Sequence, residues 1–286
     1  MNEYLGPIQF DGQHQQLDYG LFATRPLTGS IGATIERLDL AQPISDDLVE
    51  SIQTALRNHL VLFFRDQRLS PQQLATLGRR FGELHINPFA AGTSEVPEVM
   101  TVRSEENNTL RFAEKWHSDI SWERCPAMGS MLYAEQVPDI GGDTLFANMY
   151  LAYDTLDPGT RELLSNKRAV HTVLINHSGE PQYAAIPSEP VTHPVFRTHP
   201  DTGRKALFVN EYFTDAIVGI EDATARELLQ KLFAHATRPD FCCRFRWQRG
   251  DLAFWDNRCT QHYATNDYAG HSRLMLRVTI IGDEPY

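Results

Sequence analysis

The stretch DLAFWDNRCTQHYATNDY, residues 251–268, begins with a short apolar alternation and carries His262 just after it. Such an alternation, bounded by polar and turn-forming residues, is typical of a β-strand. From about residue 97 onwards, similar short pieces recur between turn signals such as Gly141–Gly142. They are VMTVRS (99–104), MGSMLYAEQV (128–137), TLFANM (144–149), KALFVN (205–210), CCRFRW (242–247) and LMLRVTIIG (274–282). Many short strands separated by turns predict a β-sandwich or barrel rather than an alternating parallel sheet.

Helices are expected to flank these strands. IGATIERLDLAQPISDDLVESIQTALRNHLVLFFRDQ (31–67) predicts a strand, a turn, a helix that starts at Ser45 and a second strand. SPQQLATLGRRFG (70–82) predicts another helix, with Ser70 as its cap. Further helices are expected in NMYLAYDTLDPGTRELLSN (148–166) and EDATARELLQKLFAHA (221–236). The first 25 residues read as an irregular arm. Proline and glycine mark no linker, so we expect a single domain over 1–286.

The composition limits the classes of function. A hydrophobic content of 42% and a charged content of 22% are ordinary for a globular protein. The net charge of -11 argues against nucleic-acid binding, which needs a basic face. We expect neither a membrane span nor a signal peptide, because no long apolar run is present and the start MNEYLGPIQF lacks a basic segment. The four cysteines show no zinc-like spacing, so a cytoplasmic protein with free thiols is expected.

Candidate metal ligands occur in WHSD (116–119). In a strand, His117 and Asp119 would point to the same face, because residues i and i+2 do so. Together with His262 they would form a set of two histidines and one carboxylate. That set leaves positions open on iron(II) for a chelating cosubstrate and for oxygen. Zinc can use the same groups, but a hydrolytic zinc site needs a positioned base, and the sequence marks none.

Two arginines follow in HSRLMLRVTI (271–280). The even separation of Arg273 and Arg277 places both on one face of a strand. A buried arginine needs an anionic partner. The pair is therefore interpreted either as structural ion pairs or as two clamps that bind anions, since the planar guanidinium suits carboxylate and sulfonate groups.

The motifs WHSD, GGDTLF (141–146), WDNRCTQHYATNDY (255–268) and HSRLMLR (271–277) occur in the order and spacing of a known family. The chain resembles the taurine dioxygenase/TfdA family of Fe(II)- and 2-oxoglutarate-dependent oxygenases from IGATIERLDL (31–40) to RVTIIGDEPY (277–286). The resemblance implies a mostly β fold with a double-stranded β-helix (jelly-roll) core and flanking helices. It implies that His117, Asp119 and His262 bind iron, that Thr144 and Arg273 bind the cosubstrate 2-oxoglutarate, and that O2 is the second cosubstrate.

The same resemblance implies that Arg277 faces an anionic group of the substrate. The segment GELHINPFA (82–90) departs from the pattern of taurine enzymes, because Asn87 and Ala90 replace a histidine and a tyrosine. Four residues before His117, Ala113 replaces an asparagine of those enzymes. These changes predict a larger and more apolar acid, such as an aryloxyalkanoate or an alkyl sulfate. Further substrate contacts are expected from an apolar wall and from a lid in HTVLINHSGEPQY (171–183). The candidates are Asn87, Ile120, Trp122, Asn176 and His177.

The expected reaction is hydroxylation of a C–H bond in a small-molecule substrate, with succinate and CO2 as co-products. Alternatives are a taurine or alkylsulfonate dioxygenase, a hydroxylase of a neutral natural product, and a barrel that binds a small molecule without catalysis. A homo-oligomer, either a dimer or a tetramer, is expected. Trp255 is expected in the core. Several other histidines are expected to be structural or surface groups: His85, His171, His193, His199 and His235.

Overall fold

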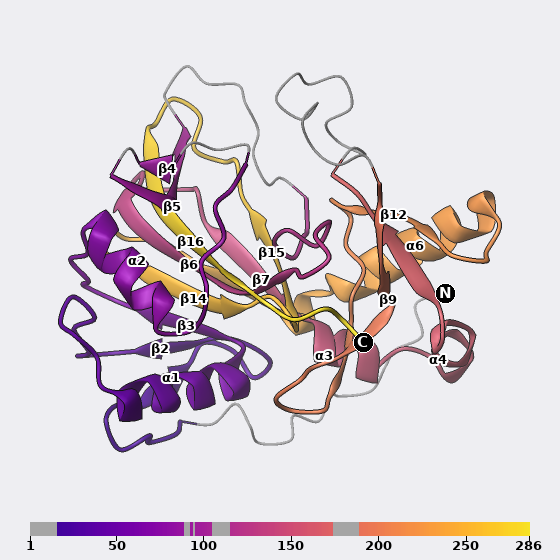
Figure 1. Cartoon of the computed structure of the whole chain (residues 1–286), viewed down its shortest axis with the longest axis horizontal. Helices are drawn as coiled ribbons and strands as arrows, with labels where there is room; N and C mark the ends of the chain where they lie inside the picture. The colour runs from indigo at the N-terminus through magenta and orange to yellow at the C-terminus, as the bar shows by residue number, and fades with distance from the viewer. Residues whose placement is uncertain (1–15, 89–91, 94, 105–114, 174–188) are drawn as a thin grey trace.

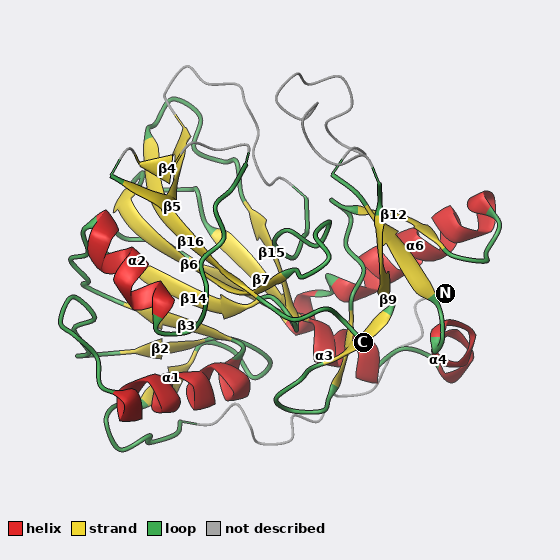
Figure 2. Ribbon diagram, in the orientation of Figure 1, coloured by secondary structure: helices red, strands yellow, loops and turns green. Residues whose placement is uncertain are grey.

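The protein is built mostly from strands, with helices at its two ends (Figure 1 and Figure 2). The computed structural model describes residues 16–88, 92–93, 95–104, 115–173 and 189–286. The helices are α1 (Asp46–His59), α2 (Pro71–Arg79), α3 (Met149–Asp154), α4 (Pro158–Leu164), α6 (Asp222–Ala236) and the 3-10 helix η2 (Pro239–Phe241). Among the described residues, no helix combines the length and the apolar character that crossing a membrane requires.

A large sheet combines strands from the N-terminal and the C-terminal parts of the chain. Its strand order is β1-β2-β3-β14-β6-β16-β5-β4, and its neighbouring strands are antiparallel except β2 and β3. The strands are β1 (Thr24–Pro26), β2 (Ala33–Ile35), β3 (Val61–Phe64), β4 (Gly92–Thr93), β5 (Val96–Ser104), β6 (Ala127–Gln136), β14 (Leu252–Asp256) and β16 (Arg273–Ile281).

A smaller antiparallel sheet, β13-β7-β15, packs on one face of the large sheet. The remaining strands form the sheet β12-β8-β9 and the hairpin β10-β11. The bounds are β7 (Thr144–Asn148), β8 (Arg168–His171), β9 (Val191–Pro194), β10 (Phe196–Thr198), β11 (Lys205–Leu207), β12 (Thr214–Ile217), β13 (Cys242–Phe245) and β15 (Thr260–Ala264).

The large sheet is buried on both faces, as β3 shows, where successive side chains point to opposite faces and all are buried. Phe63 faces the small sheet, where its ring stacks on that of Phe245 with a centroid distance of 3.9 Å. Leu62 and Phe64 point to the opposite face and join the apolar cluster of α1 and α2. The expected jelly-roll core is therefore confirmed: two sheets face each other, and helices cover the outer face of the larger one (Figure 1).

The predicted helix starts are confirmed. The Ser45 hydroxyl accepts a hydrogen bond from the Leu48 amide at the start of α1. Ser70 and Gln73 form a reciprocal capping box at the start of α2. The helical pattern over 148–166 is divided into α3 and α4, because the Asp157 side chain accepts a hydrogen bond from the Thr160 amide and starts a new helix.

Other elements differ from the expectation. The expected arm 1–25 ends earlier, because Thr24 and Arg25 belong to β1 and pair with β2, while residues 1–15 lie outside the described residues. The strands β8, β9, β10, β12 and β15 were not expected. They are three to five residues long and lack a clear apolar alternation, so their pairing with neighbouring strands defines them.

Candidate active site

The three candidate metal ligands converge in the space between the two main sheets. His117 and His262 form an isolated antiparallel bridge, in which the His117 amide donates to the His262 carbonyl (3.1 Å) and the His262 amide to the His117 carbonyl (2.8 Å). The Asp119 Oδ1 atom lies 3.7 Å from His117 Nε2 and 3.5 Å from His262 Nε2. One ligand atom of each residue lies within 4.8 Å of the others. The predicted ligand set is thus brought together.

The local backbone differs from the predicted strand. After the single bridge at His117 the chain turns, so Asp119 is placed by a turn rather than by a strand face. Ile120 follows with a φ of 45°, a left-handed conformation that is uncommon for a β-branched residue. Such strain clusters at functional sites, where the surrounding structure holds it in place.

The protonation states of the three groups suit a metal ion. Burial raises the pKa of Asp119, but the Arg277 guanidinium and the two imidazoles lower it by more, so it lies well below the usual range. Burial lowers the pKa of His117 and, more strongly, that of His262. The His117 Nδ1 atom lies 2.8 Å from the Lys115 carbonyl, which requires a proton there and leaves Nε2 free to bind a metal. An ionised carboxylate and neutral imidazoles are the forms that ligate metals.

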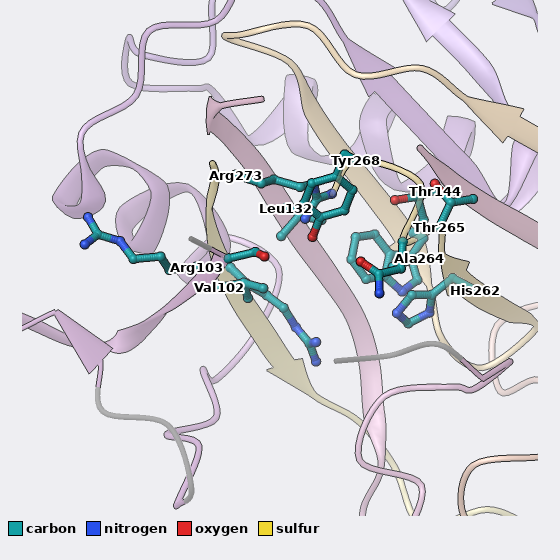
Figure 3. Close-up of a pocket in the computed structure, with 13 residues that line it drawn as sticks. Val102, Arg103, Leu132, Thr144, His262, Ala264, Thr265, Tyr268 and Arg273 are labelled. Atoms are coloured by element: carbon teal, nitrogen blue, oxygen red, sulfur yellow. The ribbon is translucent and has the colours of Figure 1, made fainter. Parts of the chain in front are cut away.

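A cavity opens beside His262, between the large and the small sheet. Its lining residues are Val102, Arg103, Ser104, Leu132, Thr144, Trp255, His262, Ala264, Thr265, Asn266, Tyr268, Arg273 and Arg277. Figure 3 shows Arg273 beside Tyr268 at one end and His262 at the other, while the Arg103 side chain points away. Trp255 belongs to the core, as expected, since only 1% of it is exposed, and it also lines this cavity.

Arg273 is a buried cation that could bind an anion. Its side chain is buried, and its Nε atom has no hydrogen-bond partner among the described residues. Burial lowers its pKa, while Tyr268 and Asp143 act in the opposite direction. Thr144 lies in the same cavity, and its Oγ1 atom accepts a hydrogen bond from Trp247 Nε1, so its own proton can be donated to a ligand. A small dicarboxylate suits this combination of groups.

Arg277 lies on the same side of β16, as the sequence predicted, and also lines the cavity. Its Nη2 atom is 2.7 Å from Asp119 Oδ1, and its Nε atom donates to Thr279 Oγ1 at 3.3 Å. The guanidinium thus lies beside the candidate metal ligands, half-buried and accessible from the cavity.

The other predicted substrate residues are placed differently. The described residues that line the cavity do not include Asn87, Ile120 or Trp122. Asn87 is half-buried, and its Nδ2 atom is 3.4 Å from Met100 Sδ. Asn176 and His177 lie outside the described residues, as do Ala90 and Ala113. Sequence reasoning missed Tyr268, although it ends the motif that carries His262.

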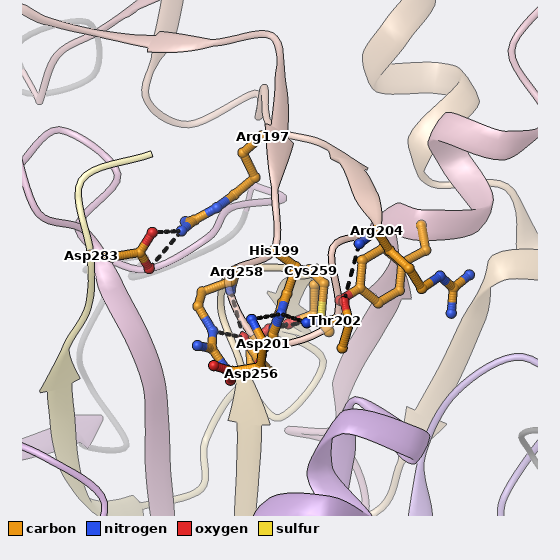
Figure 4. A network of polar contacts seen from close by, with 11 residues as sticks. Arg197, His199, Asp201, Thr202, Arg204, Asp256, Arg258, Cys259 and Asp283 are labelled. Carbon is orange, nitrogen blue, oxygen red and sulfur yellow. Dashed lines mark hydrogen bonds and ion pairs between the residues drawn. The ribbon is translucent and has the colours of Figure 1, made fainter. Parts of the chain in front are cut away.

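A second buried cluster joins His199, Asp256 and Cys259 (Figure 4). The Asp256 carboxylate receives two hydrogen bonds from the Arg258 side chain (2.9 and 2.7 Å) and lies 3.0 Å from His199 Nε2. Both carboxylate oxygens are thereby occupied, so the cluster is a structural network. His199 is accordingly a structural residue, as expected.

Comparisons with known proteins identify the family. Residues 23–279 match the model of the family described as taurine catabolism dioxygenase TauD, TfdA family. The chain is 33% identical to an alpha-ketoglutarate-dependent sulfate ester dioxygenase of Pseudomonas putida, over 91% of this chain and 89% of that protein. It is 34% identical to an alpha-ketoglutarate-dependent 2,4-dichlorophenoxyacetate dioxygenase of Cupriavidus pinatubonensis, over 90% of this chain and 97% of that protein.

A solved structure of a taurine dioxygenase from Burkholderia xenovorans superposes with a TM-score of 0.81 and 33% identity, covering 92% of both chains. The family match, the similar relatives and the jelly-roll core lead to one assignment. The chain belongs to the taurine catabolism dioxygenase (TauD/TfdA) family and is a 2-oxoglutarate-dependent dioxygenase, an oxidoreductase that uses 2-oxoglutarate and O2 as cosubstrates.

Proposed function

We propose that the protein uses Fe(II) and 2-oxoglutarate to hydroxylate a C–H bond of a small, anionic and largely apolar substrate. The observation that carries this proposal is the cavity that His262, Arg273 and Arg277 line, because His262 lies with His117 and Asp119 at one end and Arg277 lies 2.7 Å from Asp119. Two histidines and one carboxylate suit Fe(II) and leave positions for a chelating cosubstrate and O2. When bound, iron supplies the oxidation of the substrate by O2, with succinate and CO2 as co-products.

The protein's own groups hold the cosubstrate. Arg273 receives the carboxylate far from the metal, because its guanidinium is buried at the end of the cavity away from His262 (Figure 3). Thr144 donates its hydroxyl proton to a carboxylate oxygen of the same molecule. The sheets on both sides of the cavity exclude water from these contacts, which strengthens them.

The substrate class is inferred from Arg277 and its neighbours. Arg277 supplies a positive charge next to the metal ligands, while Val102, Leu132 and Trp255 give the cavity apolar walls. An acid with an apolar body fits both features. The sulfate ester and 2,4-dichlorophenoxyacetate dioxygenases that resemble the chain are named for substrates with an acidic group, which supports an alkyl sulfate or aryloxyalkanoate.

The contacts of Arg277 favour a second candidate, the hydroxylation of a neutral natural product. Its guanidinium is already paired with Asp119 at 2.7 Å, so an anionic substrate has to share it or displace it. A neutral substrate leaves the ion pair intact. A taurine or alkylsulfonate substrate is the third candidate, favoured by the similar fold of the Burkholderia xenovorans taurine dioxygenase.

Succinate release and O2 consumption distinguish these candidates. The wild type and Arg277→Gln would be assayed with Fe(II) and 2-oxoglutarate against taurine, alkyl sulfates, aryloxyalkanoates and their neutral alcohol or ester analogues. We expect the larger acids to give the highest kcat/KM and Arg277→Gln to lower it selectively for acids. Taurine as the best substrate would refute the apolar pocket. A neutral substrate that Arg277→Gln does not affect would establish the second candidate instead.

A further inference from the structure

The two oxygens of the Asp119 carboxylate have different surroundings. Oδ1 faces the two ligand imidazoles and Arg277. Oδ2 points the other way, where it accepts hydrogen bonds from Ser130 Oγ (2.6 Å) and Asn257 Nδ2 (3.2 Å). Ser130 and Asn257 are both buried, so water does not compete for these contacts. The two oxygens thus have separate partners: Oδ1 faces the imidazoles and Arg277, and Oδ2 is held by Ser130 and Asn257.

The orientation of the Asn257 amide is fixed by its partners. Its Oδ1 atom accepts from the Asp119 backbone amide (3.0 Å) and from the Trp255 indole nitrogen (3.1 Å), and both of these groups can only donate. The Nδ2 atom must therefore face Asp119 Oδ2 and Ser130 Oγ, which lies 3.0 Å away. Ser130 accepts from the amide and donates its own proton to the carboxylate, so every donor in this network has an acceptor.

The backbone around Asn257 is rigid. Its amide donates to the Met128 carbonyl at 2.9 Å, in the strand that carries Ser130. On its two sides, Asp256 and Arg258 are joined by the buried ion pair seen in Figure 4. The His199 ring holds the same carboxylate from the β10-β11 side. This network keeps the turn after β14 in place, and the turn presents the Asn257 amide to Asp119.

We propose that Asn257 and Ser130 are positioning residues that hold Asp119 Oδ2, so that the carboxylate offers a single oxygen to the metal. This inference rests on the proposed ligand set. Partners of this kind orient a ligand and raise its affinity for the metal, although they do not touch the metal. Without them the carboxylate can rotate, and both of its oxygens become available to the metal or to Arg277.

The test measures metal binding rather than turnover. Mn(II) would be titrated into the purified wild type, Asn257→Ala and Ser130→Ala, and the bound fraction would be followed by electron paramagnetic resonance. Each substitution is expected to raise the Kd for Mn(II) by about 10- to 100-fold. The double variant is expected to lose less than the product of the two factors, because both residues hold the same oxygen. The absorption of bound Co(II) should change as well, since it reports the coordination geometry.

Asn148→Ala is the matched control. Asn148 is equally buried, caps α3 through its Oδ1 atom and donates to the Ser30 carbonyl, but it makes no contact with Asp119. It should lower the Tm while leaving the Kd for Mn(II) unchanged. If Asn257→Ala does not fold, Ser130→Ala still decides the question, because it removes a single hydroxyl group.

The outcomes distinguish a failure of the positioning role from a failure of the proposed ligand set. Wild-type Mn(II) affinity in both Asn257→Ala and Ser130→Ala would overturn the positioning role, provided that Asp119→Ala abolishes binding. Wild-type affinity in Asp119→Ala would instead overturn the ligand set itself, and with it the proposed function. A Kd that rises in Asn148→Ala as much as in Asn257→Ala would show that the loss follows from general destabilisation, and would also refute the positioning role.

Discussion

Replacing Arg273 by methionine is expected to weaken 2-oxoglutarate binding and at the same time to stabilise the unliganded protein. The guanidinium is buried, forms no ion pair with a described residue, and leaves its Nε atom without a hydrogen bond. Holding a charge in that state costs folding free energy, which the bound carboxylate offsets. Methionine has a similar length and keeps the packing against the cavity wall, but it carries no charge.

The two effects have different sizes. Loss of a buried carboxylate clamp is expected to cost about 2–5 kcal/mol of binding free energy, which is roughly a 30- to 5,000-fold increase in the Kd for 2-oxoglutarate. An unsatisfied buried donor costs about 1–3 kcal/mol. Because part of the arginine packing is lost as well, a net gain of about 1 kcal/mol in the free energy of unfolding is expected, or about 2–4 °C in Tm.

Calorimetric titration of 2-oxoglutarate and thermal unfolding without ligand would measure both effects on the same preparation. Arg273→Lys is the companion variant, and it should recover part of the affinity, because a point charge cannot form the paired hydrogen bonds of the fork. An unchanged Kd in Arg273→Met would refute the clamp. A Tm several degrees lower than that of the wild type would refute the reasoning on stability, since the guanidinium would then have a stabilising partner.

Three further predictions concern stability. Burial lowers the pKa of His193 from 6.5 to about 4, so the unfolded chain binds the additional proton in this range. The contribution of His193 to the free energy of unfolding is therefore fully present above pH 6.5 and falls by up to about 3 kcal/mol as the pH drops to 4. In urea titrations, the free energy of unfolding of His193→Asn should depend less steeply on pH than that of the wild type, and an identical pH dependence would contradict this cause. Ser70→Ala removes the capping box of α2 and is expected to cost about 1 kcal/mol, so an unchanged urea midpoint would show that the cap is dispensable. Phe63→Ala opens a cavity between the two sheets and is expected to cost about 3–5 kcal/mol, whereas a loss below about 1 kcal/mol would mean that the sheets close over the gap.

The parts of the fold that sequence patterns predicted are those with local causes. Ser45 and Ser70 start their helices through contacts within a few residues, and the continuous apolar run of β14 follows from burial on both faces. The strand β15, TQHYA, has no such pattern. It is a strand because it pairs with β7 along its whole length, which depends on residues far away in the sequence.

The candidate site shows the same division. The types and spacing of His117, Asp119 and His262 indicated a metal site, and the structure brings these side chains together. The spacing suggested a strand for Asp119, but a turn with a left-handed Ile120 places it. The Oδ2 atom of Asp119 accepts a hydrogen bond from Asn257, which lies on a distant segment. A hydrogen bond between two distant segments depends on the tertiary fold, so the pattern of a single sequence does not predict it.

The bridge between His117 and His262 has a consequence for how the protein opens. Two main-chain hydrogen bonds tie the segment before β6 to β15, an edge strand of the small sheet. A metal ion bound by both imidazoles would therefore act as a removable cross-link between these two segments. Metal loading should slow hydrogen–deuterium exchange at the amides of His117 and His262, and the logarithm of the protection factor should rise with the free energy of metal binding. The iron content of a preparation would then determine how often the hydrogen bonds between His117 and His262 break, and how readily proteases cleave the chain there.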